Sequence, residues 1–283
     1  IVGILTHLLD PSQNDCFQDK YFSGIDLDLS KALFILSYND VDAIDRILLD
    51  RVHRIKFNNL STDEKESIRL RYLEVDASNV GDVLDSMNLL RQGLAADFGP
   101  YPETCKRMAG WAYTIRGQMT PYAQGGDADK MQACNGLSHG EISVWSGNGE
   151  GICYFGELIA LGMQERGCVG SLVDGGIRDV RWLGEHQFPV FARYRTPVQS
   201  IGRWKVNACQ VPVYLRGHDG SQVIIRPGDF ILADEDGAIV IPFEHVLSVL
   251  VEAERLTSVE KNIRKEIADG MSLADALKKY GHV

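Results

Sequence analysis

The sequence predicts an α/β protein with a short N-terminal α/β appendage followed by a larger α/β domain. Short, largely apolar runs of the kind found in buried strands alternate with segments whose apolar residues recur every three or four positions, as in amphipathic helices. The chain has 283 residues, 45% hydrophobic and 24% charged, so it can bury a large core. The character of the sequence changes near residues 61–66, and we predict domains at 1–66 and 67–283.

The composition argues against several functional classes. A formal net charge of -10 makes nucleic acid and acidic membrane surfaces poor general partners. The six cysteines are scattered without a CxxC pair, which indicates reduced thiols of a cytoplasmic protein rather than disulfides or a zinc site. The chain shows no signal peptide and no apolar run long enough for a membrane span. Because the first residue is Ile1, we expect the chain to begin downstream of its gene's start.

Residues 1–62 form the first part. An apolar helix is expected before Asp10, and the apolar run within 29–40 predicts a buried strand with Asn39 near its tip. This part resembles the middle of the ATPase module of Lon-type AAA+ proteases. In that comparison Asn39 matches the sensor-1 residue, and Arg51 matches the arginine that a neighbouring subunit receives at its γ-phosphate. The GxxxxGK[ST] phosphate loop does not occur in the chain, so we expect a non-catalytic fragment in which both residues are inert.

The second part begins with helices. Ser61 or Thr62, followed by glutamates, is expected to cap a helix. The apolar residues within 76–87 have helical spacing, and Ser78 is the expected cap of that helix. A polar, glycine-containing loop is expected at 118–140, between strands at 108–115, 142–145 and 152–155.

A central motif then joins a helix to a strand. Gly156 allows a sharp turn into a helix that begins at Glu157, and Gly167 ends that helix as a left-handed cap residue. The apolar run 168–173 predicts a buried strand. Two glycines and a loop with the charged pair Arg178 and Asp179 follow at the end of the strand.

These residue types suit a small metal-bound oxo acid. The unpaired amides at a helix start hold anions, and an arginine such as Arg178 grips a carboxylate with two parallel hydrogen bonds. The carboxylate of Asp179 is a hard oxygen ligand for Mg²⁺ or Mn²⁺. The alternative is that a Gly-Glu helix start is commonplace and that the charged pair is a solvated surface pair of little energetic value.

Short strands and two helices complete the chain. Asp234, Glu235 and Asp236 are expected to form a turn between strands rather than a metal site. A long helix is expected at 243–267, and Ser272 begins a capped terminal helix. The other strands are expected at 188–193, 202–206, 211–214, 223–229 and 230–242.

From residue 72 to 283 the chain resembles the family of class II 4-hydroxy-4-methyl-2-oxoglutarate aldolases, which also contains the regulator of ribonuclease activity A (RraA). The resemblance implies a swivelling β/β/α domain that assembles as a homotrimer or hexamer with active sites between subunits. Five blocks in the same order carry it: Gly156–Gly167, Val173–Asp179, Phe188–Arg193, Pro227–Asp229 and Ala233–Gly237.

The resemblance also implies roles for the motif residues. Asp179 would bind the divalent metal, and Arg178 would bind the oxygens of the oxo acid. Backbone amides from Gly156 through Glu157 and Leu158 to Ile159 would hold the pyruvoyl carboxylate, and Glu157 would hold a metal-bound water. An acidic residue from a neighbouring subunit's C-terminal helix would complete the site, with Glu254 and Glu260 as open alternatives.

The implied activity is a metal-dependent lyase reaction. Cleavage of a 4-hydroxy-2-oxo acid leaves an enolate on the pyruvate half, which a cation and a guanidinium stabilise as it forms. Oxaloacetate gives the same enolate on losing CO₂, so decarboxylation is an expected side activity. The motif supplies no lysine, which argues against a Schiff-base aldolase. The alternative is a non-catalytic RraA-like protein that binds and regulates a ribonuclease or another partner.

Overall fold

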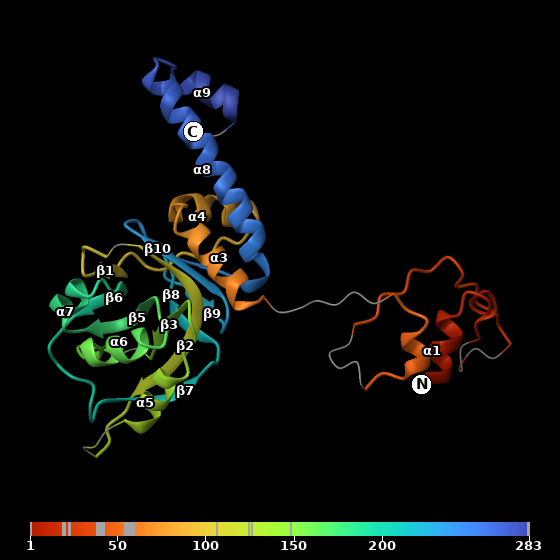
Figure 1. Cartoon of the computed structure of the whole chain (residues 1–283), viewed down its shortest axis with the longest axis horizontal. Helices are drawn as coiled ribbons and strands as arrows, with labels where there is room; N and C mark the ends of the chain where they lie inside the picture. The colour runs from red at the N-terminus through yellow and green to blue at the C-terminus, as the bar shows by residue number, and fades with distance from the viewer. Residues whose placement is uncertain are drawn as a thin grey trace. The chain divides into compact units, whose positions relative to one another are not determined.

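The computed structural model describes residues 2–18, 21, 24–37, 43–53, 60–105, 107–123, 125, 127–147 and 149–281. The chain divides into two compact units, Ile1–Asn59 and Leu60–Val283 (Figure 1). No helix in the described ranges is long and apolar enough to cross a membrane.

The first unit contains short helices joined by irregular chain. Its elements are α1 (Val2–Leu9), the 3-10 helix η1 (Asn14–Cys16) and α2 (Arg46–Leu49). Helix α1 is the expected apolar start. The strand expected within 29–40 is not formed over its described residues, where Leu33 and Ile35 are 86% and 85% exposed. An apolar run becomes a buried strand only where other strands cover it, and this stretch pairs with none in the described part of the unit. Asn39 lies outside the described residues, and Arg51 lies 3.5 Å from the carboxylate of Asp10.

The second unit is built on one mixed sheet. In the described residues its strands follow the order β1-β6-β5-β3-β2-β10-β11, with β4 beside β5 and β7 beside β2. The central strands β2, β3, β5 and β6 are parallel, and the strands at both edges are antiparallel. The strands of this sheet are β1 (Gly99–Tyr101), β2 (Met108–Met119), β3 (Glu141–Ser146), β4 (Cys153–Phe155), β5 (Gly170–Ile177), β6 (Val190–Arg195), β7 (Trp204–Cys209), β10 (Phe230–Asp234) and β11 (Gly237–Ile241).

The two faces of this sheet have different covers. One face packs on the antiparallel pair β8 (Val213–Arg216) and β9 (Gln222–Ile225), and the other packs on helices. Alternation along the central strands separates the two cores: Leu172 faces the β8–β9 side and Val173 the helical side. The resulting order of strand pair, sheet and helices is the β/β/α layering implied by the family resemblance.

Most expected helices are present. Ser61 caps α3 in a capping box with Glu64, and Ser272 caps α9 by accepting the N–H of Asp275. The cap expected at Ser78 is wrong, because Asp76 precedes the helix and Ser78 lies in its first turn. Helix α8 runs beyond the sheet and α9 folds back at its end (Figure 1). These helices are α3 (Thr62–Tyr72), α4 (Ala77–Ser86), α8 (Val246–Ala268), preceded by the 3-10 helix η2 (Phe243–His245), and α9 (Leu273–Tyr280).

Three more helices lie near the central motif: α5 (Ala128–Asn135), α6 (Glu157–Gln164) and α7 (Val180–Glu185). The expected loop at 118–140 therefore contains a helix, α5. Its apolar pattern is weak because one of its buried residues is Lys130. Asp127 starts this helix by accepting the N–H of Lys130. This cap favours a helix, but the glycine-rich residues around it favour a loop, and the sequence therefore predicted a loop here.

Strand β5 is longer than expected. All eight of its residues, Gly170–Ile177, are buried, and the two glycines expected after the strand lie inside it. A side chain at either glycine would clash, since a Cβ at Gly175 would lie 2.4 Å from the hydroxyl of Tyr154 and a Cβ at Gly176 2.5 Å from the ring of Tyr194. The glycines therefore let aromatic rings pack against the strand just before the charged pair.

Candidate active site

Two chain segments meet at the carboxyl end of β5. Arg178 and Asp179 follow the strand directly, and Asp179 takes a left-handed conformation, φ 59°, before α7 begins. Strand β4, which pairs with β5, leads through Gly156 into α6. Parallel neighbouring strands place both connections at the same edge of the sheet, the usual position of a ligand site in open α/β sheets.

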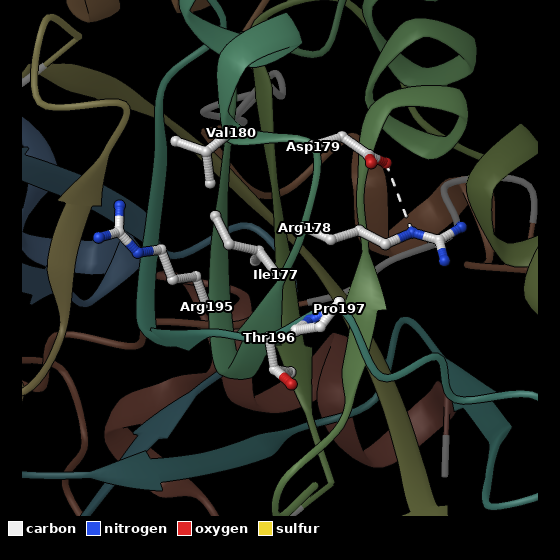
Figure 2. A pocket seen from close by; sticks show the side chains of 7 residues that line it. All are labelled: Ile177, Arg178, Asp179, Val180, Arg195, Thr196 and Pro197. Atoms are coloured by element: carbon white, nitrogen blue, oxygen red, sulfur yellow. Dashed lines mark ion pairs between the residues drawn. The ribbon is translucent and has the colours of Figure 1, made fainter.

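The carboxylate of Asp179 faces the start of α6. Its Oδ2 accepts the backbone N–H of Glu157 at 3.0 Å and lies 3.4 Å from Nε of Arg178. Figure 2 shows the two side chains on the same side of their segment, joined by the dashed line. Both remain accessible, with 46% of the Arg178 side chain and 36% of the Asp179 side chain exposed. The structure thus brings Arg178, Asp179 and the amide end of α6 together.

The helix start keeps amides free for a ligand. The first four N–H groups of an α-helix have no partner within it. Asp179 takes the N–H of Glu157, and we find no acceptor in the described part of the chain for the N–H groups of Leu158 and Ile159. Leu158 is 77% exposed, so this end of α6 faces outward. An anion beside Asp179 would find two amides and the guanidinium of Arg178.

Gly156 permits this close approach. A Cβ at this position would lie 2.6 Å from Oδ2 of Asp179 and 3.0 Å from Cγ of Arg178. The backbone of Gly156 is extended, with φ -175°, so any residue could adopt its conformation. Glycine is therefore required by space rather than by backbone geometry.

Two hollows border the charged pair. One, of about 650 Å³, is lined by residues 177–180 and 195–197, and Arg195 points to the side opposite Arg178 (Figure 2). The other, of about 320 Å³, lies between α5, β4 and the start of α6. Arg178 and Asp179 line both.

The smaller hollow contains residues that the sequence did not single out. Lys130 of α5 lines this hollow, although Lys130 is only 9% exposed. The hollow is also lined by Asp127, Tyr122 and Ser200. Burial lowers the pKa of Lys130. Because the segment of Lys130 was expected to be a loop, nothing in the sequence placed this lysine beside Arg178.

The donor atoms of Asp179 fit a divalent cation. We find no hydrogen bond to Oδ1 of Asp179 in the described residues, so this oxygen is available. No group of three or more His, Cys, Asp or Glu side chains in the described part of the chain is arranged so that it could hold a metal ion by itself. Mg²⁺ is commonly held by one or two carboxylates and several waters, so a single aspartate at the rim of an open hollow fits it.

The two glutamates considered for completing the site have partners in their own chain. Glu254 accepts two hydrogen bonds from Arg71, at 2.8 and 2.6 Å, and Glu260 pairs with Arg264 at 2.6 Å. Asp234 and its neighbours form the β10–β11 turn, as expected, and Asp234 accepts the N–H of Ala77.

Known proteins are similar to this chain over different parts of its length. A family model described as "RraA-like: Aldolase/RraA" matches residues 77–240. Protein DlpA of Legionella pneumophila is 27% identical over 80% of this chain, which spans 35% of that protein's length. A protein of Halalkalibacterium halodurans named "Putative 4-hydroxy-4-methyl-2-oxoglutarate aldolase" is 27% identical, covering 75% of this chain and 94% of its own. A Lon protease homolog of Acanthamoeba polyphaga mimivirus is 40% identical over 91 residues, 31% of this chain and 9% of that protein.

Solved structures show the same fold. A structure described as novel cellulases from gut-associated microbes matches with a TM-score of 0.65 and 26% identity, covering 75% of this chain and 91% of its own. Streptomyces coelicolor RraAS2, described as an unusual member of the RNase ES inhibitor RraA protein family, matches with a TM-score of 0.60 and 21% identity over 74% of this chain and 99% of its own. At 21% identity the second likeness concerns the fold alone.

Proposed function

The chain belongs to the RraA-like family, and from this premise we propose that it is a divalent-metal-dependent aldolase. Its substrates would be 4-hydroxy-2-oxo acids of the 4-hydroxy-4-methyl-2-oxoglutarate type, cleaved to pyruvate. The observation that carries this proposal is the carboxylate of Asp179 held 3.0 Å from the start of α6, with Arg178 beside it and free amides on the same rim.

The chemistry requires stabilisation of an enolate. When the bond between C3 and C4 breaks, its electron pair becomes the enolate of pyruvate, and the C4 hydroxyl gives its proton to water as the second carbonyl forms. A proton returned to C3 of the enolate then yields pyruvate. Arg178 would donate hydrogen bonds to the oxo and enolate oxygen, where negative charge develops. The N–H groups of Leu158 and Ile159 would hold the adjacent carboxylate. Glu157, in the first turn of α6, would orient water near the C4 hydroxyl.

A divalent cation, Mg²⁺ or Mn²⁺, would be held by Asp179 and would supply positive charge to offset that of the enolate. Oxaloacetate yields the same enolate when it loses CO₂, so the site would also act as an oxaloacetate decarboxylase. Asp179 would give the cation one carboxylate, which leaves positions for a second acidic group from a neighbouring subunit of a homotrimer or a hexamer.

We assign this activity to residues 67–283 and treat 1–66 as a non-catalytic Lon-like fragment. In the second unit, the motif residues and both hollows that border them lie within this range. The six cysteines are free thiols, which supports a reducing, cytoplasmic location.

The test is release of pyruvate from a panel of 4-hydroxy-2-oxo acids and from oxaloacetate, with Mg²⁺ or with a chelator. Asp179→Asn should reduce kcat/KM by about 100-fold or more, because it removes the anionic ligand while keeping the side chain's shape. Asp85→Asn, at an exposed carboxylate on α4, is the matched control and should leave activity unchanged.

Activity that survives both Asp179→Asn and chelation would contradict the proposal. Absence of turnover on every oxo acid, together with tight binding to a ribonuclease, would instead favour the non-catalytic regulatory role.

A further inference from the structure

Lys130 lies in an unusual position for a lysine. Lys130 as a whole is 9% exposed. Its Nζ lies 5.6 Å from the ring centre of Trp145 and 5.9 Å from that of Trp204, and both tryptophans are fully buried. The same residue lines the 320 Å³ hollow beside Arg178 and Asp179. The aliphatic stem of Lys130 therefore lies in the core, and the residue forms part of the wall of the hollow.

The ammonium group has no anionic partner in the described part of the chain, where we find neither an ion pair nor a hydrogen bond to its Nζ. Asp127, the carboxylate on the same turn of chain, raises the pKa of Lys130 through its charge but forms no ion pair with it, and each of its oxygens accepts a backbone N–H. Oδ1 accepts the backbone N–H of Lys130 at 3.0 Å, and Oδ2 accepts that of Val206 at 3.1 Å.

A buried ammonium without a partner is costly, and the cost falls when an anion binds it. The faces of two tryptophan rings compensate only part of the lost hydration. Burial, the largest cause, lowers the pKa of Lys130; the charge of Asp127 opposes this shift, and the charge of Arg178, a smaller cause, adds to it. Two cations that repel each other across one hollow favour a ligand with two negative groups.

We propose that Lys130 is a substrate-binding residue that holds the distal carboxylate of a dicarboxylic 2-oxo acid whose oxo-carboxylate end lies at Arg178 and the start of α6. The identity of the ligand rests on the proposed aldolase function, whereas the anion-binding role rests on the geometry of the hollow. A volume of about 320 Å³ is at the small end of ligand pockets, which suits a short-chain diacid. Lys130 would thus make the site prefer diacids over monoacids of the same length.

The experiment compares two uncleavable five-carbon probes, 2-oxoglutarate and 2-oxopentanoate, which differ in one carboxylate. Binding is measured with Mg²⁺ by calorimetry and by tryptophan fluorescence, in the full chain. Lys130→Met keeps an unbranched side chain but removes the charge, and it should weaken 2-oxoglutarate binding by about tenfold or more. Its effect on 2-oxopentanoate should stay within about twofold, and Lys130→Arg should restore part of the preference.

Lys65→Met is the matched control, because Lys65 also sits over a tryptophan, Trp111, at 5.5 Å, but does not line the hollow. It should leave both affinities unchanged. Should Lys130→Met fail to fold, acetylation of Lys130 in the unchanged protein, followed by mass spectrometry, gives the same answer: 2-oxoglutarate should protect it and 2-oxopentanoate should not.

The outcomes separate this inference from the proposed function. Selective loss of 2-oxoglutarate binding without pyruvate release from any substrate would retain Lys130 as an anion-binding residue and reject the aldolase. Equal loss for both probes, no protection of Lys130, or no binding of 2-oxoglutarate to the unchanged protein would overturn the inference.

Discussion

Two arginine–aspartate groups flank the same strand, β5, and only one of them is open to a ligand. Arg193, 13% exposed, contacts three carboxylates: Asp97 at 2.9 Å, Asp174 at 3.4 Å and Glu150 at 3.5 Å. Arg178, whose side chain is 46% exposed, forms an ion pair with only one carboxylate among the described residues, that of Asp179, through Nε at 3.4 Å. The residue types are the same, but Arg193 is largely enclosed and its Nε and Nη1 are shared among three carboxylates, while Arg178 retains free donors beside two hollows.

The comparison shows what distinguishes a structural ion pair from a candidate site. A guanidinium has five N–H donors. Where carboxylates of the same chain surround it, fewer of these donors remain for a ligand. Because such a network is buried, removing one charged partner strongly lowers the stability of the fold. At Arg178 the pairing is weak, because exposed ion pairs contribute little to stability, and its donors remain available for chemistry.

The largest effects are expected when each arginine is replaced, one at a time, by methionine, which removes the guanidinium. Arg193→Met should lower the free energy of unfolding by about 3–5 kcal/mol, because it leaves buried Asp174 without its partner. Arg178→Met should lower it by about 1 kcal/mol or less but reduce kcat/KM by about 100-fold or more. Urea unfolding and pyruvate release measure the two effects. If Arg178→Met proved as destabilising as Arg193→Met, the distinction between the groups would fail.

A smaller effect is expected where the two segments of the open site meet. Gly156→Ala should push Asp179 away from α6 and reduce kcat/KM by about tenfold, at a cost in stability of about 1–3 kcal/mol. Gly162→Ala is the control in the same helix, because a Cβ there meets nothing within 4 Å. It should leave activity unchanged and raise stability by about 0.5–1 kcal/mol. Similar kinetics for the two variants would show that contact between Asp179 and α6 is irrelevant.

The smallest expected effect concerns the pH dependence of stability that Asp174, a partner of Arg193, produces. Burial raises the pKa of Asp174 above its ordinary value of 3.8, although Arg193 opposes the shift. A carboxyl whose pKa is higher in the folded state binds its proton more tightly there, so its contribution to stability falls as pH rises from 3.8 through the folded pKa. Asp174→Asn should therefore remove part of this decline. Parallel stability–pH curves for the two proteins, measured by urea unfolding, would contradict it.

Much of the local structure could be predicted from the sequence. Helix starts such as Ser61 with Glu64, helix ends such as Gly167, and the buried run of β5 follow from the chemistry of a few neighbouring residues. The errors arose where tertiary contacts override such signals. Residues 29–37 pair with no strand in the described part of the first unit, and the polar residues around α5 favoured a loop.

By itself, the sequence determined the α/β class, the order of most elements in the second unit, and the presence of Arg178 and Asp179 after a buried strand. Only the tertiary structure decided that Asp179 accepts the N–H of Glu157, 22 positions away, and that Lys130 shares their hollow. It also decided which arginine is held by several carboxylates, because the partners of Arg193 come from distant segments. Local periodicity and capping act between neighbours in the chain, whereas pairing, burial and open space depend on residues that only folding brings together.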